Sequence, residues 1–433
     1  MDLKSGAARE KIKIRPPGPI NAEVEVPGSK SYSHRLLIGA ALADGASEIT
    51  GLLKSEDTLL TLAALQKFGA VIKETPTGAV LQGTGGHLTG GGDIYLGNSG
   101  TSMRLLCAVA ALSCGTSILS GTGRMHERPV GELLDALAQL HIPAVSMAGS
   151  GCPPVRITGA GINGGTVDGG ALSVDCGVSS QHLSGLLLMA PYTRSGLDIT
   201  VTRGPVSRPY IRMTLEIMDR LGVSAESPSD TRYIVPGGQC FRAGRYAVEP
   251  DASNSSYFWA AALICGGTVS VTGHAADSRQ GDLRLLKIFE RMGGRVDRVP
   301  GRIAVTGGPL TAVDVDMGDM PDMVPTLSVV AAFAKGNTRI RNVAHLKAKE
   351  CDRMAAVAAE LGKMGIRVDC SESEMVICGG RPRPAEIRTY DDHRMAMAFA
   401  AAGLGIPGTV ILDPDCVRKS FPGFWEVFDR LYT

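Results

Sequence analysis

Net charge, aromatic residues and long apolar runs are all scarce in this sequence. Lys and Arg together number 44 against 43 Asp and Glu, so no bulk field draws the chain to nucleic acid or to a membrane surface. No run approaches the ~18 consecutive apolar residues of a membrane span, and the first segment, MDLKSGAAREKIKIRPPG, lacks the apolar core of a signal peptide. We therefore expect a cytoplasmic protein that builds any anion site from local charge.

Cysteine spacing argues against a disulfide-rich protein and against a cysteine metal site. The ten cysteines form no CxxC pair, and several stand inside apolar helical runs. This pattern favours buried, reduced thiols over a disulfide framework or a metal site. The phosphate-binding pattern GxxxxGK[ST] is also missing, which excludes nucleotide binding through such a loop.

Glycine is abundant, at 55 of 433 residues, and it punctuates a repeat. Six segments share a polar start, a helix of small apolar residues, a glycine and a β-rich run, as in NSGTSMRLLCAVAALSCGTSILSG. They start near residues 29, 98, 179, 253, 322 and 391, about 70 residues apart. A second helix also recurs, as in LLKIFERMGGRVDR. Sequential α/β proteins can look vaguely periodic, but two helices in register favour six units of strand, helix, strand, helix, strand, strand.

The sixth unit lacks room for its last strands, whereas the N-terminus carries two spare ones, KIKIRP and AEVEVPG. We predict that both complete the sixth unit. One domain then comprises residues 1–27 and 250–433, and the other residues 28–249, with three units in each. Two strand crossings would join them and make a natural hinge, with the active site in the cleft.

Charged and hydroxyl side chains gather where the first helix of a unit begins. A helix N-terminus offers unpaired N–H groups and a partial positive charge, so several facing one cleft would bind a multiply charged anion. The candidate segments are Ser29–Arg35, Gly97–Arg104, Arg124–Pro129, Ser179–Gln181, Ser207–Tyr210, Asp322, Lys347–Arg353, Asp391–Arg394 and Lys419.

Plainer interpretations remain open at several of these segments. Helix capping alone would explain the serines and Asp322. The charges of RMHERP could simply be solvated. Lys349 and Arg353 are four apart, so on a helix they would share a face with Glu350 beside them, which is also the pattern of a surface ion-pair ladder.

Taken together, PGSKSYSHR, GNSGTSMR, RMHERP, SSQ, SRPY, KAKECDR, DDHRMAMAFA and KSFPGF resemble the EPSP synthase family of enolpyruvyl transferases. The resemblance covers essentially the whole chain, with the motifs in the family's order. It implies an inside-out α/β barrel, in which two globular domains each contain three βαβαββ repeats.

The resemblance also implies a reaction. The enolpyruvyl group of phosphoenolpyruvate passes to the 5-hydroxyl of shikimate 3-phosphate through a tetrahedral intermediate that releases phosphate, a step of the shikimate pathway to chorismate and aromatic amino acids. One group must protonate C3 of phosphoenolpyruvate and another must accept the hydroxyl proton. Asp322 is the candidate base, and Glu350 and Lys30 are candidates at C3 and the leaving phosphate.

Site residues carry over from the family by position. Shikimate 3-phosphate is expected to bind Lys30, Ser31, Arg35, Ser179, Ser180, Gln181, Ser207, Tyr210, Asp322 and Lys349. Phosphoenolpyruvate is expected to bind Lys30, Gly100, Arg128, Gln181, Arg353, Arg394 and Lys419. Where some members have Asn, four residues before Lys349, this chain has His345, so a contact from that position to the shikimate ligand is in doubt.

The resemblance implies no metal or organic cofactor, and we expect a monomer. Because Gly100 has no side chain to obstruct a mimic of phosphoenolpyruvate, we predict inhibition by glyphosate. Two alternatives are a UDP-N-acetylglucosamine enolpyruvyl transferase of the same fold, which SKSYSHR, SGTSMR and SSQ disfavour, and a non-catalytic repeat scaffold, which should scatter its cations.

Overall fold

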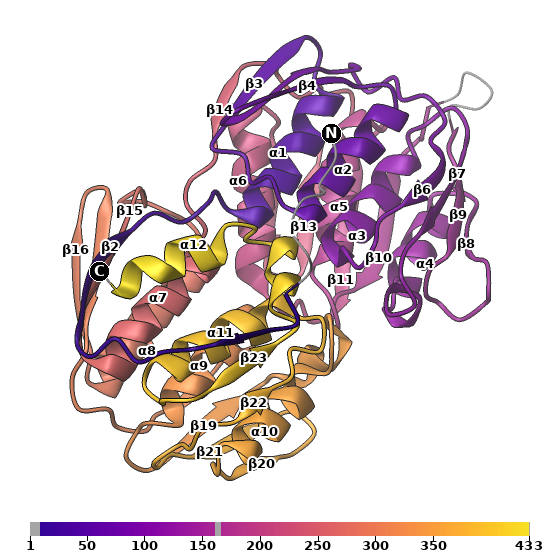
Figure 1. Ribbon diagram of the computed structural model, residues 1–433. Helices are drawn as coiled ribbons and strands as arrows, with labels where there is room; N and C mark the ends of the chain where they lie inside the picture. Colours follow the sequence, from indigo (N-terminus) through magenta and orange to yellow (C-terminus); the bar gives the residue numbers. More distant parts are fainter. Residues whose placement is uncertain (1–8, 161–165, 433) are drawn as a thin grey trace. The chain divides into compact units, whose positions relative to one another are not determined.

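The computed structural model describes residues 9–160 and 166–432. The chain divides into two compact units (Figure 1). The terminal unit comprises Met1–Val26, Pro250–Ser278 and Asp282–Thr433, and the central unit comprises Pro27–Glu249 with Arg279–Gly281. The segment before residue 9, on which the prediction about a signal peptide partly rests, lies outside the described residues.

The predicted repeat is confirmed most directly in three units whose elements are contiguous in the chain. The second repeat contains β6 (Gly92–Tyr95), α3 (Gly100–Ala110), β7 (Thr116–Ser120), α4 (Gly131–Gln139), β8 (Ala144–Ser146) and β9 (Val155–Thr158). The third contains β10 (Gly170–Asp175), α5 (Gln181–Met189), β11 (Leu197–Arg203), α6 (Arg208–Arg220), β12 (Glu226–Ser229) and β13 (Arg232–Val235). The fifth contains β18 (Asp314–Asp316), α9 (Val324–Ala331), β19 (Asn337–Arg341), α10 (Arg353–Lys363), β20 (Val368–Cys370) and β21 (Met375–Cys378).

Each of these repeats forms one sheet with the same order. In the second, β6 pairs parallel with β7, and β9 pairs antiparallel with both β7 and β8. The first helix of the repeat makes the crossover that a parallel pair requires.

The other three repeats borrow a strand from elsewhere. The first contains α1 (Lys30–Leu42), β3 (Ala46–Thr50), α2 (Glu56–Lys67), β4 (Val71–Thr75) and β5 (Gly78–Gln82), and it takes β14 (Arg245–Ala247). The fourth contains α7 (Ala252–Cys265), β15 (Gly267–Thr272), α8 (Leu285–Met292), β16 (Arg295–Val299) and β17 (Arg302–Thr306), and it takes β2 (Ile20–Val24). The sixth contains β22 (Glu386–Ile387), α11 (His393–Leu404), β23 (Val410–Leu412) and α12 (Phe424–Asp429), and it takes β1 (Lys11–Lys13).

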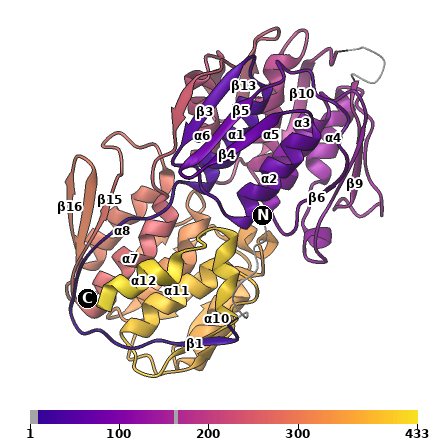
Figure 2. The same ribbon diagram turned by 45° about the horizontal axis from the view of Figure 1, so that its top comes forward.

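The prediction that both N-terminal strands complete the sixth repeat is therefore wrong for one of them. β1 does pair antiparallel with β23, and Figure 2 shows this indigo strand within the orange and yellow unit. β2 instead pairs parallel with β15 in the fourth repeat. The reason is that the fourth repeat begins with its helix α7, so its first strand has to come from another segment, as β14 does for α1.

The inner helices are buried on every side. The middle of α1 (Leu36, Leu37 and Ile38) is fully buried, as is nearly all of α3, α5, α7, α9 and α11. A helix that is apolar all round belongs inside a core. In Figures 1 and 2 the sheets lie outside these helices within each unit.

The predicted α/β class, with two units of three repeats and helices inside, is confirmed. The described strands form six separate sheets, five of four strands and one of three, rather than a closed barrel. Each unit has its own hydrophobic core.

The ten cysteines are all free thiols, as expected, but the expectation that they are buried is wrong for most of them. Cys107 and Cys176 are buried, whereas Cys114, Cys240 and Cys370 are exposed. The difference follows from position, since Cys107 faces the core from α3 and Cys114 follows the end of that helix.

Candidate active site

The start of α1 holds a buried ion pair. Ser29 caps the helix by accepting a hydrogen bond from the backbone N–H of Tyr32, at 3.5 Å. Lys30 follows, and its Nζ lies 3.1 Å from Oδ2 of Asp57 at the start of α2; the two side chains are 12% and 3% exposed. Asp57 also accepts a bond from Ser102 through its backbone oxygen, at 3.2 Å, so the starts of α1, α2 and α3 meet around this lysine.

Arg35 lies deeper in the same place and has polar but uncharged partners. Its guanidinium donates to Thr214 Oγ1 at 2.7 Å, to the backbone oxygens of Ser31 and Tyr210 at 3.0 and 3.2 Å, and to Ser184 Oγ at 3.2 Å. Burial lowers the pKa of Arg35 to about 10, which leaves it protonated at neutral pH. A buried cation among neutral groups favours an anion nearby.

Gly100, Gln181 and Pro129, the residue after Arg128, all accept hydrogen bonds from a further arginine. Arg104 is buried in α3, and it donates to Gln181 Oε1 at 3.1 Å, to the Pro129 oxygen at 2.9 Å and to the Gly100 oxygen at 3.5 Å. Arg104 therefore ties the starts of α3 and α5 to the segment that carries Arg128.

The guanidinium of Arg128 is also fixed in place. Its Nη1 donates to the backbone oxygen and to Oδ1 of Asn98, at 2.8 and 3.1 Å. The arginine is 4% exposed, so the interpretation of RMHERP as solvated charge is wrong for this residue. The interpretation as solvated charge holds for Arg124, which is partly exposed and pairs with Glu127 at 2.7 Å.

The predicted phosphate-binding hydroxyls stand at two helix starts. Ser179 accepts from the backbone N–H of Gln181 at 3.2 Å, and Ser180 is the buried residue before α5. Ser207 precedes α6 with a left-handed backbone, φ 54°, and Tyr210 lies in the first turn of that helix. With the residues above, they form what we call the central-unit group: Lys30, Ser31, Arg35, Gly100, Arg128, Ser179, Ser180, Gln181, Ser207 and Tyr210.

The terminal unit holds a second cluster, built around Asp322. Arg353 donates to Asp322 Oδ1 and Arg394 to Oδ2, both at 2.8 Å, and Lys349 Nζ lies 3.9 Å from Oδ1. Burial would raise the pKa of Asp322, but the charges of Arg394, Lys349 and Arg353 hold it well below its usual range. The carboxylate stays ionised at neutral pH.

Arg353 is shared among three carboxylates. It also donates to Glu350 Oε2 at 2.8 Å and to the two oxygens of Asp392 at 2.7 and 3.2 Å. Although burial opposes its charge, Asp392, Glu350 and Asp322 raise the pKa of Arg353. We call Asp322, Lys349, Glu350, Arg353, Asp392 and Arg394 the Asp322 group.

Two interpretations from the sequence are corrected here. Lys349 and Arg353 do not share a helix, because α10 begins at Arg353 and Lys349 follows the preceding 3-10 turn (Ala344–Ala348). They meet through Asp322, and Arg353 is 1% exposed, which excludes a surface ladder. Asp322 is not a cap, since its oxygens face the arginines, whereas Asp251 does cap α7 by accepting from Asn254 N at 2.9 Å.

Two further residues stand beside the Asp322 group. Lys419 is buried at the end of a 3-10 turn (Pro414–Lys419), and its charge acts on Asp391. His345 is also buried, and burial together with the charge of Lys349 lowers its pKa to about 4. A neutral imidazole at this position could donate or accept a hydrogen bond without adding charge.

Sequence reasoning missed Asp57 and Asp282, and it left Asp392 and Arg104, which lie in candidate segments, without a role. Acidic residues are common at N-caps and in the first turn of a helix, so Asp57 and Asp392 do not stand out in the sequence. Asp282 is buried and accepts from Ser253; burial and the charge of Asp322 raise its pKa to about 6. No local pattern marks it.

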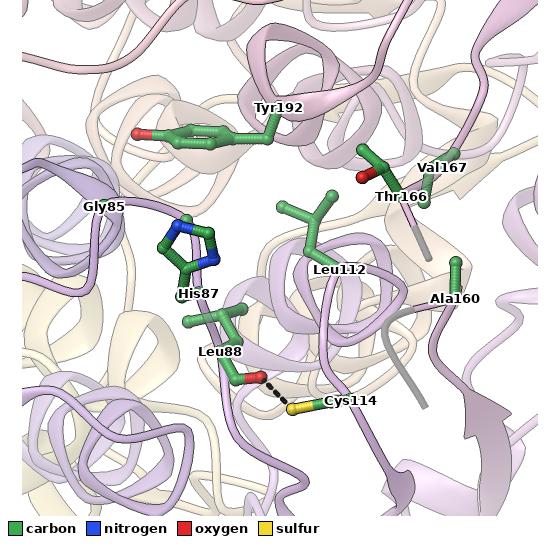
Figure 3. A pocket seen from close by; sticks show the side chains of 10 residues that line it. Gly85, His87, Leu88, Leu112, Cys114, Ala160, Thr166, Val167 and Tyr192 are labelled. Atoms are coloured by element: carbon green, nitrogen blue, oxygen red, sulfur yellow. Dashed lines mark hydrogen bonds between the residues drawn. The ribbon is translucent and has the colours of Figure 1, made fainter. Parts of the chain in front are cut away.

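The described part of the central unit also has a cavity of about 390 Å³, away from these clusters. Figure 3 shows Tyr192, Leu112 and His87 around it. It lies past the C-terminal ends of α3 and α5, where the helix dipoles disfavour anions. We assign no ligand to it, because Ala160 and Thr166 in its wall flank residues outside the described part.

Comparison with known proteins decides the family. Residues 14–428 match the family described as EPSP synthase (3-phosphoshikimate 1-carboxyvinyltransferase). The chain belongs to the EPSP synthase family. It is 41% identical to the 3-phosphoshikimate 1-carboxyvinyltransferase of Sulfurovum sp. over 97% of this chain and 99% of that one. It is 42% identical to the enzyme of that name from Syntrophobacter fumaroxidans, over 96% and 99%.

A solved structure agrees. The EPSP synthase of Acinetobacter baumannii superposes with a TM-score of 0.80 at 27% identity, covering 97% of each chain. The predicted family, fold and activity are confirmed: this is an enzyme of the shikimate pathway that carries out enolpyruvyl transfer. The scaffold alternative is thereby excluded.

The described residues show neither a membrane-spanning helix nor a cluster of metal ligands. Residues 9–160 and 166–432 contain no helix with both the length and the apolar character needed to cross a bilayer. Within the same ranges, no group of three or more His, Cys, Asp or Glu side chains is arranged to hold a metal ion.

Proposed function

We propose that the central-unit group and the Asp322 group both belong to the active site. There the enolpyruvyl group of phosphoenolpyruvate would pass to the 5-hydroxyl of shikimate 3-phosphate. The observation that carries this proposal is the Asp322 group, because it holds an ionised carboxylate among three cations, at the start of helices whose N-termini attract anions.

Shikimate 3-phosphate would bind mainly to the central-unit group. Ser179, Ser180 and Ser207 would hold its phosphate, which their positions at the starts of α5 and α6 support. Its other binding residues would be Lys30, Ser31, Arg35, Gln181, Tyr210, Asp322 and Lys349. We leave His345 as a neutral neighbour of this ligand.

Phosphoenolpyruvate would bind to residues of both groups and to Lys419. Its proposed ligands are Lys30, Gly100, Arg128, Gln181, Arg353, Arg394 and Lys419. The burial of Arg128, Arg353, Arg394 and Lys419 supports this role, since a charge acts most strongly on a transition state where water is excluded.

The reaction would proceed by addition and elimination. The 5-hydroxyl oxygen bonds to C2 of phosphoenolpyruvate as Asp322 accepts the hydroxyl proton, while Glu350 or Lys30 delivers a proton to C3. Phosphate would then leave from C2 of the tetrahedral intermediate as C3 returns a proton to the group that supplied one. Asp322 is a weak base while three cations hold its pKa low, but the anionic substrates would compensate those cations and raise it.

A phosphate-release assay tests this proposal. Phosphate should be released from phosphoenolpyruvate when shikimate 3-phosphate is present and not when it is omitted or replaced by UDP-N-acetylglucosamine. Lys30→Met should lower kcat/KM by several orders of magnitude. The matched control is Lys54→Met, since Lys54 pairs with Glu74 at the surface of the same unit, at 3.3 Å. Near-normal turnover by Lys30→Met would remove Lys30 from the mechanism.

We further propose that the enzyme acts as a cytoplasmic monomer without a cofactor. The reaction needs proton transfer and charge stabilisation, and side chains supply both. Size-exclusion chromatography with light scattering should give about the 45.2 kDa of one chain. Activity that falls on extensive dialysis against a chelator, and returns with a metal, would contradict the proposal.

A further inference from the structure

Two residues with left-handed backbone stand just before Asp392, the N-cap residue of α11. Tyr390 and Asp391 have φ values of 56° and 52°. Asp tolerates this region, but a bulky residue such as Tyr rarely enters it, because its Cβ crowds the following carbonyl oxygen. A pair of this kind persists when surrounding contacts hold it in place.

Glu360 supplies those contacts from α10. Its side chain is fully buried, and it accepts a hydrogen bond from Tyr390 Oη at 2.7 Å and from the backbone N–H of Arg388 at 3.1 Å. Lys363 Nζ pairs with the same carboxylate at 2.7 Å. The Arg388 guanidinium lies 5.1 Å from the centre of the Tyr390 ring and covers it.

The segment held in this way leads directly into the Asp322 group. Asp392 is fully buried, and it accepts from the backbone N–H of Arg394 at 2.9 Å and from Arg353 at 2.7 Å. Arg394 in turn reaches Asp322 at 2.8 Å. Helix α10 therefore holds both ends of residues 388–392, through Glu360 at one end and Arg353 at the other.

We propose that Glu360 is a positioning residue, which holds the Tyr390–Asp391 turn and thereby sets Asp392 and Arg394 for substrate. The inference rests on the proposed function, since it assigns Arg394 to phosphoenolpyruvate. Glu360 touches neither substrate; it acts through the hydroxyl of Tyr390. If that bond breaks, residues 390–391 relax toward ordinary backbone and Arg394 loses its alignment.

Tyr390→Phe tests this inference, because it removes one hydroxyl and keeps the ring under Arg388. Given the usual worth of a hydrogen bond to a charged group, the KM for phosphoenolpyruvate should rise about tenfold. The KM for shikimate 3-phosphate should change less than about twofold. The amides of Arg388, Asp392 and Arg394 should exchange hydrogen faster than in the wild type.

A control and a rescue sharpen the result. Tyr246 on strand β14 also donates a hydroxyl hydrogen bond, to the Arg242 oxygen at 2.6 Å, so Tyr246→Phe removes a comparable bond and should change neither KM. Adding Asp391→Gly to Tyr390→Phe should lower the KM for phosphoenolpyruvate back toward the wild-type value, because glycine adopts positive φ at no steric cost.

The outcomes separate this inference from the proposed function. A wild-type KM and wild-type amide exchange in Tyr390→Phe would overturn the inference while leaving the proposed function intact. Equal losses for both substrates, with no rescue by Asp391→Gly, would indicate general destabilisation and overturn it too. If the wild type itself shows no turnover, the proposed function fails, and amide exchange in the variants still decides whether Glu360 holds the turn.

Discussion

Replacing Gly100 by alanine should weaken phosphoenolpyruvate binding through Arg128. A Cβ built on Gly100 would lie 2.4 Å from Nη2 and 2.6 Å from Cζ of Arg128, and 2.9 Å from Nη1 of Arg104. Non-bonded carbon contacts are favourable at about 3.5–4.0 Å, so these guanidinium groups have to move. Gly100 begins α3, where alanine is a good residue, so the cost falls on the arginines rather than on the helix.

The size of the effect follows from what holds Arg128. Its Nη1 makes two hydrogen bonds to Asn98, at 2.8 and 3.1 Å, and a shift of about an ångström breaks at least one of them. A bond that involves a charged group is worth about 1.5–3 kcal/mol. If the displaced guanidinium loses a comparable contact with substrate, the KM for phosphoenolpyruvate should rise about 10- to 150-fold.

The assay is phosphate release at saturating shikimate 3-phosphate, with phosphoenolpyruvate varied. Gly123→Ala is the matched control, because a Cβ at Gly123 meets no heavy atom within 4 Å and the residue precedes the same arginine-bearing segment. That variant should keep the wild-type KM. A KM for Gly100→Ala within twofold of the wild type would refute the reasoning, since it would mean that Arg128 yields at no cost.

Three further predictions follow from the same structure. Asp322→Asn should lower kcat by about two to four orders of magnitude if Asp322 is the base, whereas a change confined to KM would restrict it to binding. Burial lowers the pKa of His274 to about 4, so the unfolded chain binds more protons than the folded one between pH 4 and 6.5. The free energy of unfolding should therefore fall as pH falls through that window, and His274→Gln should reduce its dependence on pH by up to about 1.4 kcal/mol per pH unit. Urea titrations at several pH values measure this dependence, and an equal dependence in wild type and variant would contradict the prediction. Glyphosate should inhibit turnover in competition with phosphoenolpyruvate, and unchanged turnover at millimolar inhibitor would oppose that prediction.

The repeat was predictable from sequence because each unit carries its own local signals. A helix of small apolar residues, a glycine and a β-rich run recur in every unit, and they specify the same strand order each time. The partner of a lone strand was not predictable in this way. β1 and β2 are both short, alternating strands near the N-terminus, and nothing in their residues distinguishes the sixth sheet from the fourth.

The site residues also divide into those that local motifs identify and those that only the folded structure reveals. Motifs identified the segments that carry Lys30, Arg128 and Arg353. Lys30 in particular is a cation at the start of an apolar helix, which is unusual. Their partners Asp57 and Asp392 resemble common capping acids, and they gain meaning only when folding brings α2 beside α1 and α11 beside α10. Spacing misled for Lys349 and Arg353, because the helix that would align them starts one turn too late.

Charge balance within the Asp322 group bears on how binding and chemistry are coupled. Lys349, Arg353 and Arg394 are matched by Asp322, Glu350 and Asp392, so the cluster is close to neutral before substrate arrives. Removing one partner from a buried ion pair is costly, whereas exchanging it for another anion is not. Under the proposed function, the carboxylate or phosphate of phosphoenolpyruvate would take over Arg394 from Asp322. The exchange would return basicity to Asp322 only when substrate is bound, so the bond that holds the resting cluster together would also keep its base inactive until it is needed.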